Sequence, residues 1–305
     1  MKNIKTLLLL CMLGGMALFG TTACSGDDDS VVTPDDGVKL RHITIREADG
    51  SAVPRRLRPL AVLTDGEDLS ATWTAGDRLA YCNLSRMNPM TEEVYSGMLT
   101  ATASARISPF TGDVVCRAGD YLAVVYPAVS FEANDGYHLS LTGQDGTLAT
   151  LATSYHYVYG KALVTSVTDQ SAEATMDKMK SLLTVCKFSF VDKATGDVIP
   201  VKTLSVCYGG DGSDAGTYPE AAEVAIGTNI SQADVHVAGV AGNAPLAITC
   251  LSEQDAVYAA LLPTSELRTF RFTVSNSGGT YSGTAKATLN EGEYVVATGL
   301  KLNEQ

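Results

Sequence analysis

The sequence predicts an all-β protein built of β-sandwiches, and three observations support this fold class. Residues 137–142, 186–190 and 270–274 alternate apolar and polar side chains, as strands do when one face is buried and the other is wet. Residues 120–127 and 255–263 contain nearly continuous apolar runs, which fit strands covered on both faces. Short glycine-rich segments separate these runs, so we expect many short strands joined by turns.

The first 23 residues are typical of a cleaved export signal. Two lysines precede the uncharged apolar residues 7–20, and small residues then lead to Cys24. The apolar stretch is shorter than the roughly 20 residues that a membrane span needs. Its end is similar to a lipobox, although Thr21 stands where that motif usually has leucine. We therefore predict a lipoprotein signal peptide at residues 1–23 and lipidation of Cys24; an ordinary secretory signal is the alternative.

Residues 24–37 form a predicted acidic tether. The segment is polar and too poor in apolar residues to fold. Its acidic run resembles the signal by which lipoproteins of Bacteroides-like bacteria reach the cell surface, and a merely solvated tether is the alternative. We expect an outer membrane lipoprotein, exposed at the cell surface, whose attachment comes from lipid on Cys24.

Composition limits the number of domains and the kinds of partner. Without residues 1–23 the chain has 282 residues (305 − 23), which is enough for two ordinary domains. Loss of the two signal lysines takes the formal net charge from −12 to −14, and so acidic a chain is not drawn to nucleic acid. The low-propensity segment 166–174 is the best place to divide the folded part. We predict an N-terminal domain at 38–178 and a C-terminal domain at 179–305.

Two local elements complete the prediction. Met176, Met179 and Leu183 recur at spacings of three and four, which predicts one helix at residues 172–183. Turn signals after the strand at 270–274 and before Tyr294 predict a C-terminal meander of three strands.

Cysteine usage indicates buried thiols. Five cysteines remain in the folded part: Cys82, Cys116, Cys186, Cys207 and Cys250. An odd number cannot pair completely, and no two have the spacing of a zinc knuckle. We expect small buried hydrophobic residues, with at most one or two disulfides whose position the sequence does not reveal.

Catalytic motifs are absent from the sequence. It contains no H-E-x-x-H, no G-x-S-x-G and no phosphate-binding loop, so we predict no enzyme, no cofactor and no metal. Residues 211–214 could offer oxygens to calcium, but they lack the ligand number of a calcium loop, and a polar hairpin tip is the favoured interpretation.

A series of short motifs resembles the fimbrillin family, in the same order along the chain. The matching segments are the W-x-x-G-D at 73–77, the strand that ends in Tyr126-Pro127, the Q-x-G-T at 144–147, the tyrosine-rich run at 155–160, the strand at 182–190 and the G-x-Y at 292–294. Each match is weak, but together they cover most of residues 40–302.

The resemblance implies two tandem transthyretin-like β-sandwich domains and a structural, tip or accessory subunit of surface fimbriae. Such a subunit is assembled by strand donation with other fimbrial subunits and contributes to cell adhesion. The alternative is a monomeric surface lipoprotein that binds host or bacterial glycans. An enzyme is a third class, which no motif supports.

The resemblance also implies maturation by cleavage after an arginine in the N-terminal region. Arg55, Arg56 and Arg58 lie between the predicted strand at 43–45 and Trp73. Cleavage there would free the lipidated segment and leave an open groove in the first domain; a merely basic loop is the alternative.

The C-terminal segment predicts a place in the fibre. Eleven residues (305 − 294) follow Tyr294, and the alternation through Leu302 uses nearly all of them. We therefore expect a subunit that accepts a strand but supplies none from its C-terminus. The alternative is that residues 294–302 themselves swing out as the donor.

Four aromatic side chains are candidates for either packing or binding. Trp73 precedes the turn at Gly76 and is expected to pack over the first sandwich. Tyr155, Tyr157 and Tyr159 would share one strand face if the segment is extended, and they are weak candidates for sugar contact. A core stripe or a domain interface is the favoured interpretation of the three tyrosines.

Overall fold

The computed structural model describes residues 37–48, 62–64, 70–86, 95–131, 137–226 and 235–305. All of them belong to one compact unit, residues 36–305. No helix among the described residues is long and apolar enough to cross a membrane.

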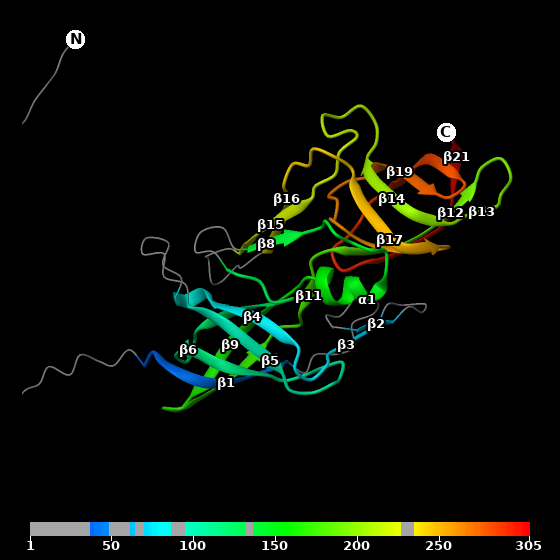
Figure 1. Ribbon diagram of the computed structural model, residues 1–305. Helices are drawn as coiled ribbons and strands as arrows, with labels where there is room; N and C mark the ends of the chain where they lie inside the picture. The colour runs from blue at the N-terminus through cyan, green and yellow to red at the C-terminus, as the bar shows by residue number, and fades with distance from the viewer. Residues whose placement is uncertain (1–36, 49–61, 65–69, 87–94, 132–136, 227–234) are drawn as a thin grey trace, which may run out of the picture. The chain divides into compact units, whose positions relative to one another are not determined.

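The first sheet closes on itself (Figure 1). Its strands are β1 (Lys39–Glu47), β4 (Arg78–Asn83), β5 (Ser96–Ala101), β6 (Phe110–Cys116), β7 (Tyr121–Tyr126), β9 (Val158–Val167), β10 (Ser171–Met176) and β11 (Lys180–Ser181). Their order is β10-β1-β6-β5-β4-β7-β9-β11, and β10 also pairs with β9. All strands except β11 therefore form a ring.

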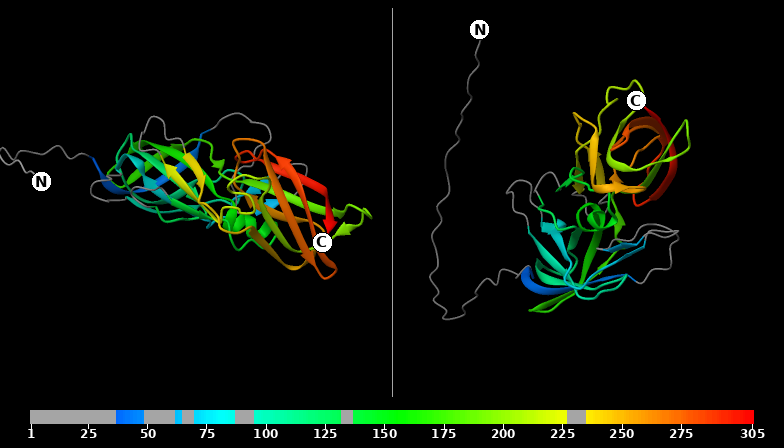
Figure 2. Two further views of the ribbon diagram at one scale, coloured as in Figure 1. Left: turned by 90° about the horizontal axis from the view of Figure 1, so that it is seen from above. Right: turned by 45° about the vertical axis from the view of Figure 1, so that its right-hand side comes forward.

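The second sheet follows in the chain. Its strands are β12 (Thr184–Asp192), β13 (Val198–Ile199), β14 (Val201–Tyr208), β17 (Leu246–Gln254), β18 (Val257–Leu261), β19 (Arg268–Asn276), β20 (Gly279–Ala287) and β21 (Tyr294–Glu304). Their order is β13-β12-β21-β20-β19-β14-β17, with β18 beside β12. Figure 2 shows β19, β20 and β21 in orange to red.

Smaller elements complete the fold. A three-stranded sheet contains β8 (Tyr137–Ser140), β15 (Ala221–Ile226) and β16 (Val235–Gly239), and β2 (Val62–Thr64) pairs with β3 (Ser70–Thr72). The helical turns are η1 (Leu84–Arg86), α1 (Leu148–Thr150) and the π-helix η2 (Leu151–Tyr155).

The predicted strands are largely confirmed. Residues 186–190 lie in β12 and residues 270–274 in β19, with burial that alternates along each strand. The apolar runs at 120–127 and 255–263 contain β7 and β18, which are buried on both faces over most of their length.

The predicted helix at residues 172–183 is wrong. This segment contains β10 and β11, and burial in β10 alternates strictly, with Ala172, Ala174 and Met176 inside. The period of two within β10 outweighs the spacing of Met176, Met179 and Leu183: Met176 lies in β10, Met179 in the loop before β11 and Leu183 in the bend after β11.

The predicted C-terminal meander is only partly right. β19 and β20 pair along their whole length, but β20 and β21 pair only at Tyr281–Glu304 and Ser282–Asn303. β21 instead lies parallel to β12, from Val185–Tyr294 to Asp192–Leu302. β21 thus pairs mainly with the distant strand β12, which carries Phe188 and Phe190, and not with its sequence neighbour β20.

Candidate functional site

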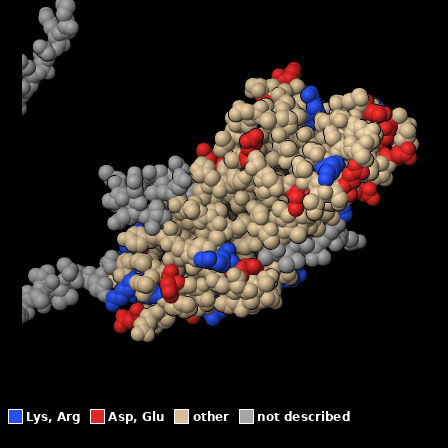
Figure 3. All heavy atoms as spheres, in the orientation of Figure 1, with Lys and Arg blue, Asp and Glu red and all other residues tan. Residues whose placement is uncertain are grey.

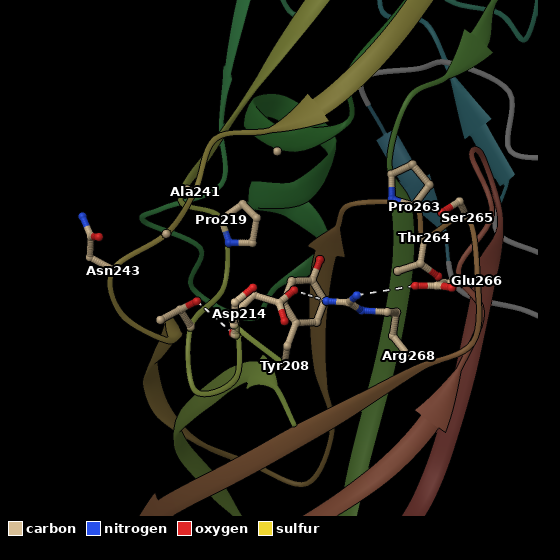
Figure 4. A pocket seen from close by; sticks show the side chains of 14 residues that line it. Tyr208, Asp214, Pro219, Ala241, Asn243, Pro263, Thr264, Ser265, Glu266 and Arg268 are labelled. Atoms are coloured by element: carbon tan, nitrogen blue, oxygen red, sulfur yellow. Dashed lines mark hydrogen bonds and ion pairs between the residues drawn. The ribbon is translucent and has the colours of Figure 1, made fainter. Parts of the chain in front are cut away.

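A polar pocket, shown in Figure 4, lies in the second half of the described chain. It measures about 670 Å³ and lies between the ends of β14, β16 and β19. Arg268 is held there by an ion pair to Asp214, and its Nη1 lies 3.7 Å from Glu266 Oε1. Its guanidinium covers one face of the Tyr208 ring at 4.3 Å from the centroid.

The other contacts of this pocket also leave little for a sugar to bind. The Tyr208 ring packs against Tyr218 and Phe270, with centroids 5.0 and 5.8 Å apart. Together with Arg268, these two rings make Tyr208 part of a packed aromatic cluster. Asp214, at the predicted hairpin tip 211–214, binds Arg268 in this structure.

Metal and catalytic groups do not gather in the described part of the chain. No three His, Cys, Asp or Glu side chains of these residues are placed to hold a metal ion. On the face seen in Figure 3, acidic and basic side chains are scattered in small groups. A candidate surface for another polypeptide is instead formed around β1.

Strand β1 occupies the feature of the fold that is best suited to such a role. It runs antiparallel to β6, from Lys39–Cys116 to Ile45–Phe110, and parallel to β10, from His42–Ser171 to Glu47–Met176. Ile43 and Ile45 are fully buried beneath it. We call the place that this strand fills the β1 seat: it consists of β6, of β10 with the β9–β10 turn before it, and of the core side chains beneath them.

Arg41 anchors β1 in its seat and was not singled out from the sequence. The side chain is only 4% exposed. Its Nε donates to Thr168 O at 2.6 Å, and its Nη1 donates to Gly37 O at 2.8 Å and to Cys116 O. The sequence did carry a signal, because Arg41 lies on the same strand phase as Ile43 and Ile45.

The buried carboxylate of Asp120 lies beside the C-terminal end of β6. Asp120 is 2% exposed and accepts hydrogen bonds from Asn83 Nδ2 at 3.0 Å, Arg86 Nε at 3.2 Å and the Arg117 backbone N–H at 3.1 Å. Asp120 therefore fixes the turn between β6 and β7. Its role is structural in the described contacts.

Trp73 packs as predicted. It is 3% exposed, and its ring meets Phe110 and Tyr126 edge-on, with centroids 4.9 and 5.3 Å apart. Gly76 has a φ of 99°, and Asp77 Oδ2 accepts from Thr74 N at 2.8 Å. The W-x-x-G-D motif is thus a turn that delivers the ring to the core.

The three candidate tyrosines are buried. Tyr155 ends η2, Tyr157 precedes β9 and Tyr159 lies within β9, so they do not share one strand face. Tyr155 donates to Thr142 O at 2.5 Å. Burial raises the pKa of Tyr155, Tyr157 and Tyr159, and these positions fit the core interpretation of the run.

The cysteines of the folded part all have free thiols. Cys82, Cys116, Cys186, Cys207 and Cys250 are each buried, as small hydrophobic residues would be. Four other predicted site residues, Cys24, Arg55, Arg56 and Arg58, lie outside the described residues.

Comparison with known proteins adds information on the fold. No protein-family model matches the chain, and no curated protein matches its sequence. A candidate cell adhesion protein from Bacteroides uniformis superposes with a TM-score of 0.51 at 13% identity, over 89% of this chain and 98% of that one. One from Bacteroides ovatus gives 0.48 at 10%, over 88% and 96%.

A more distant match is the shaft pilin SpaA from Lactobacillus rhamnosus GG, with a TM-score of 0.35 at 8% identity, over 88% of this chain and 98% of that one. At identities this low a likeness concerns the fold, and the score for the B. uniformis protein lies just above 0.5. The chain therefore shares its β-rich fold with the B. uniformis protein.

Proposed function

We propose that the protein is a subunit of surface fimbriae, in a structural, tip or accessory position, assembled by strand donation and contributing to cell adhesion. It travels to the outer membrane as a lipoprotein with its lipid attached to Cys24. Its partners are other fimbrial subunits. Cleavage at Arg55, Arg56 or Arg58 then separates the lipidated segment from the rest of the chain. The proposal includes two transthyretin-like domains, residues 38–178 and 179–305.

The observation that carries the proposal is the place of β1 in the first sheet. β1 is a single strand with a partner on each side, and the ring opens if it leaves. A foreign strand could rebuild both ladders, because backbone hydrogen bonds do not depend on sequence. The arginines at 55, 56 and 58 follow β1 in the sequence, where cleavage would detach it from the chain that it completes.

Two further observations support the proposal. The fold likeness to a candidate cell adhesion protein from B. uniformis agrees with a role at the cell surface. The ordered motifs that resemble fimbrillins agree with a fimbrial position. Both are similarities, and the experiments below address the function itself.

N-terminal sequencing of protein sheared from the cell surface tests the maturation step. We expect a start after Arg55, Arg56 or Arg58, and a start at Cys24 would contradict it. A variant with all three arginines changed to glutamine should keep the lipidated N-terminus. Arg106→Gln, which changes an exposed arginine between β5 and β6, is the matched control and should be processed normally.

Electron microscopy of whole cells labelled for this protein tests the fimbrial assignment. We expect label along filaments or at their tips in the wild type. In the triple-glutamine variant the label should stay at the membrane. Label spread over the membrane in the wild type, with no filaments, would instead favour the monomeric glycan-binding alternative.

A further inference from the structure

The buried guanidinium of Arg41 singles out the β1 seat. Its hydrogen bonds within the described residues include four to backbone carbonyls, those of Gly37, Lys39, Cys116 and Thr168, and it also interacts with the Cys116 thiol. No carboxylate of the described residues lies within ion-pair distance of it. A buried cation is normally paired with a carboxylate, whereas carbonyl oxygens hold the Arg41 guanidinium. These carbonyls are arranged to accept from a planar group with several N–H donors.

Two of these carbonyls belong to the seat and not to β1. Cys116 ends β6, and Thr168 lies in the turn between β9 and β10. Arg41 therefore crosses the β1 seat and joins its two walls. If β1 leaves, Cys116 O and Thr168 O lose this donor, and an incoming strand must satisfy them again.

The alternation of buried and exposed residues in β1 fixes the position of that hydrogen-bond donor along the strand. Residues 41, 43 and 45 point to the core, since Arg41, Ile43 and Ile45 are buried while Leu40 and His42 are exposed. We infer that the β1 seat selects a strand with the pattern basic–x–aliphatic–x–aliphatic, supplied by another polypeptide. This inference rests on the proposed strand donation and adds the sequence class of the partner.

The described strands of this chain offer no second donor of that kind. In β21 the residue two positions before Leu300 is Thr298, which cannot replace a guanidinium. In β14 the pattern recurs as Lys202, Leu204 and Val206, but that strand is paired on both sides, with β17 and β19. Apart from β1 itself, the described strands thus hold no free copy of the pattern, and the donor that we infer is a strand of a different subunit.

Peptide uptake by the cleaved chain tests the selectivity. The full chain is cut with an arginine-specific protease and incubated with a peptide of residues 38–48, or with its Arg41→Gln, Arg41→Lys or His42→Gln version. Retained peptide is measured by native mass spectrometry. We expect the Gln peptide to be held about tenfold more weakly, because buried carbonyls stay unpaired.

The other peptides define the result. His42 points outward, to Asp113 at 3.0 Å, so its Gln version should bind within about threefold of the parent peptide. The Lys version should lie between parent and Gln, since an ammonium cannot donate from a planar fork. Equal retention of the Gln and parent peptides would overturn the selectivity while leaving strand donation intact. Failure of every peptide to enter would overturn strand donation, and the inference with it.

A measurement on the uncut chain tests the anchor without any exchange. In the full-length Arg41→Gln variant we expect hydrogen exchange in residues 39–47 to be about tenfold faster, while β12 and β19 keep their protection. His42→Gln should leave the exchange of β1 unchanged. Identical exchange in Arg41→Gln and the wild type would mean that the guanidinium does not hold β1, which refutes the inference.

Discussion

The side-chain amide of Gln144 pairs with the backbone of Ala260 as a neighbouring strand would. Its Nε2 donates to Ala260 O at 3.0 Å, and its Oε1 accepts from Ala260 N at 2.8 Å. The same Nε2 donates to Leu141 O at 2.8 Å, and the residue is 2% exposed. One buried side chain thus completes the outer edge of β18, which pairs with β12 on its other side.

Loss of this bridge should be costly. Gln144→Ala leaves the N–H and C=O of Ala260 without this side-chain partner. Leaving a buried polar group unsatisfied costs about 1–3 kcal/mol. We expect the free energy of unfolding in urea to fall by about that amount. Gln170→Ala, at an exposed turn position, is the control and should change it by less than about 0.5 kcal/mol. Equal stability of the two variants would contradict the bridge.

Trp73 should report on the first sheet. It is the single tryptophan of the chain and lies between Phe110 and Tyr126, so its emission should be blue-shifted in the native state and move to the red on unfolding. Trp73→Ala should lower the free energy of unfolding by about 3–5 kcal/mol. Tyr95→Ala removes a half-exposed ring and should cost far less. A red-shifted native emission would show that Trp73 is not in the core.

Asp120 should be far more important for stability than an exposed aspartate. Asp120→Ala removes the carboxylate that bonds Arg86 and Asn83, and breaking a buried pair in this way costs about 3–5 kcal/mol. Asp169→Ala removes an exposed pair with Lys39 at 3.4 Å, whose loss should cost about 0–1 kcal/mol. Thermal unfolding of both variants tests the contrast, and similar melting temperatures would argue against it.

The five thiols should be slow to react. Burial raises the pKa of each of them, to about 12 for Cys82, so the thiolate fraction at pH 8 is small. We expect slow alkylation in the native state, led by Cys207 as the most exposed of the five, and five rapid modifications in denaturant. The native rate should increase as the pH rises toward these pKa values. Fast labelling at pH 8 would show that the thiols are accessible.

Sequence periodicity predicted the strands because it reports burial, which acts on each residue separately. The alternation in β12 and β19 and the apolar run of β7 were visible in this way. The parallel pairing of β21 with β12 was not, since nothing in local alternation says which distant strand lies alongside. The helix predicted at 172–183 failed for a related reason: the spacing of three and four joins one strand residue, Met176, to two residues that lie outside the strands.

The site was harder to predict than the fold. Arg41 stood on the buried phase of its strand, but a basic residue there is normally discounted unless its carbonyl partners are known, and they come from residues 37, 116 and 168. Gln144 was recognised only as part of a motif. Its partner Ala260 is 116 residues away, beyond the reach of any local pattern.

The parallel pairing of β12 with β21 also constrains how the chain is made. β12 begins at Thr184, but its parallel neighbour β21 begins only at Tyr294. β12 can form this pairing only when residues 294–302 are present. A polypeptide delivered from its N-terminus therefore keeps the edge of β12 unpaired through more than 100 intervening residues, because non-local pairing waits for the whole loop to be available. We therefore expect the second sheet to be completed late in folding, once residues 294–302 can pair with β12.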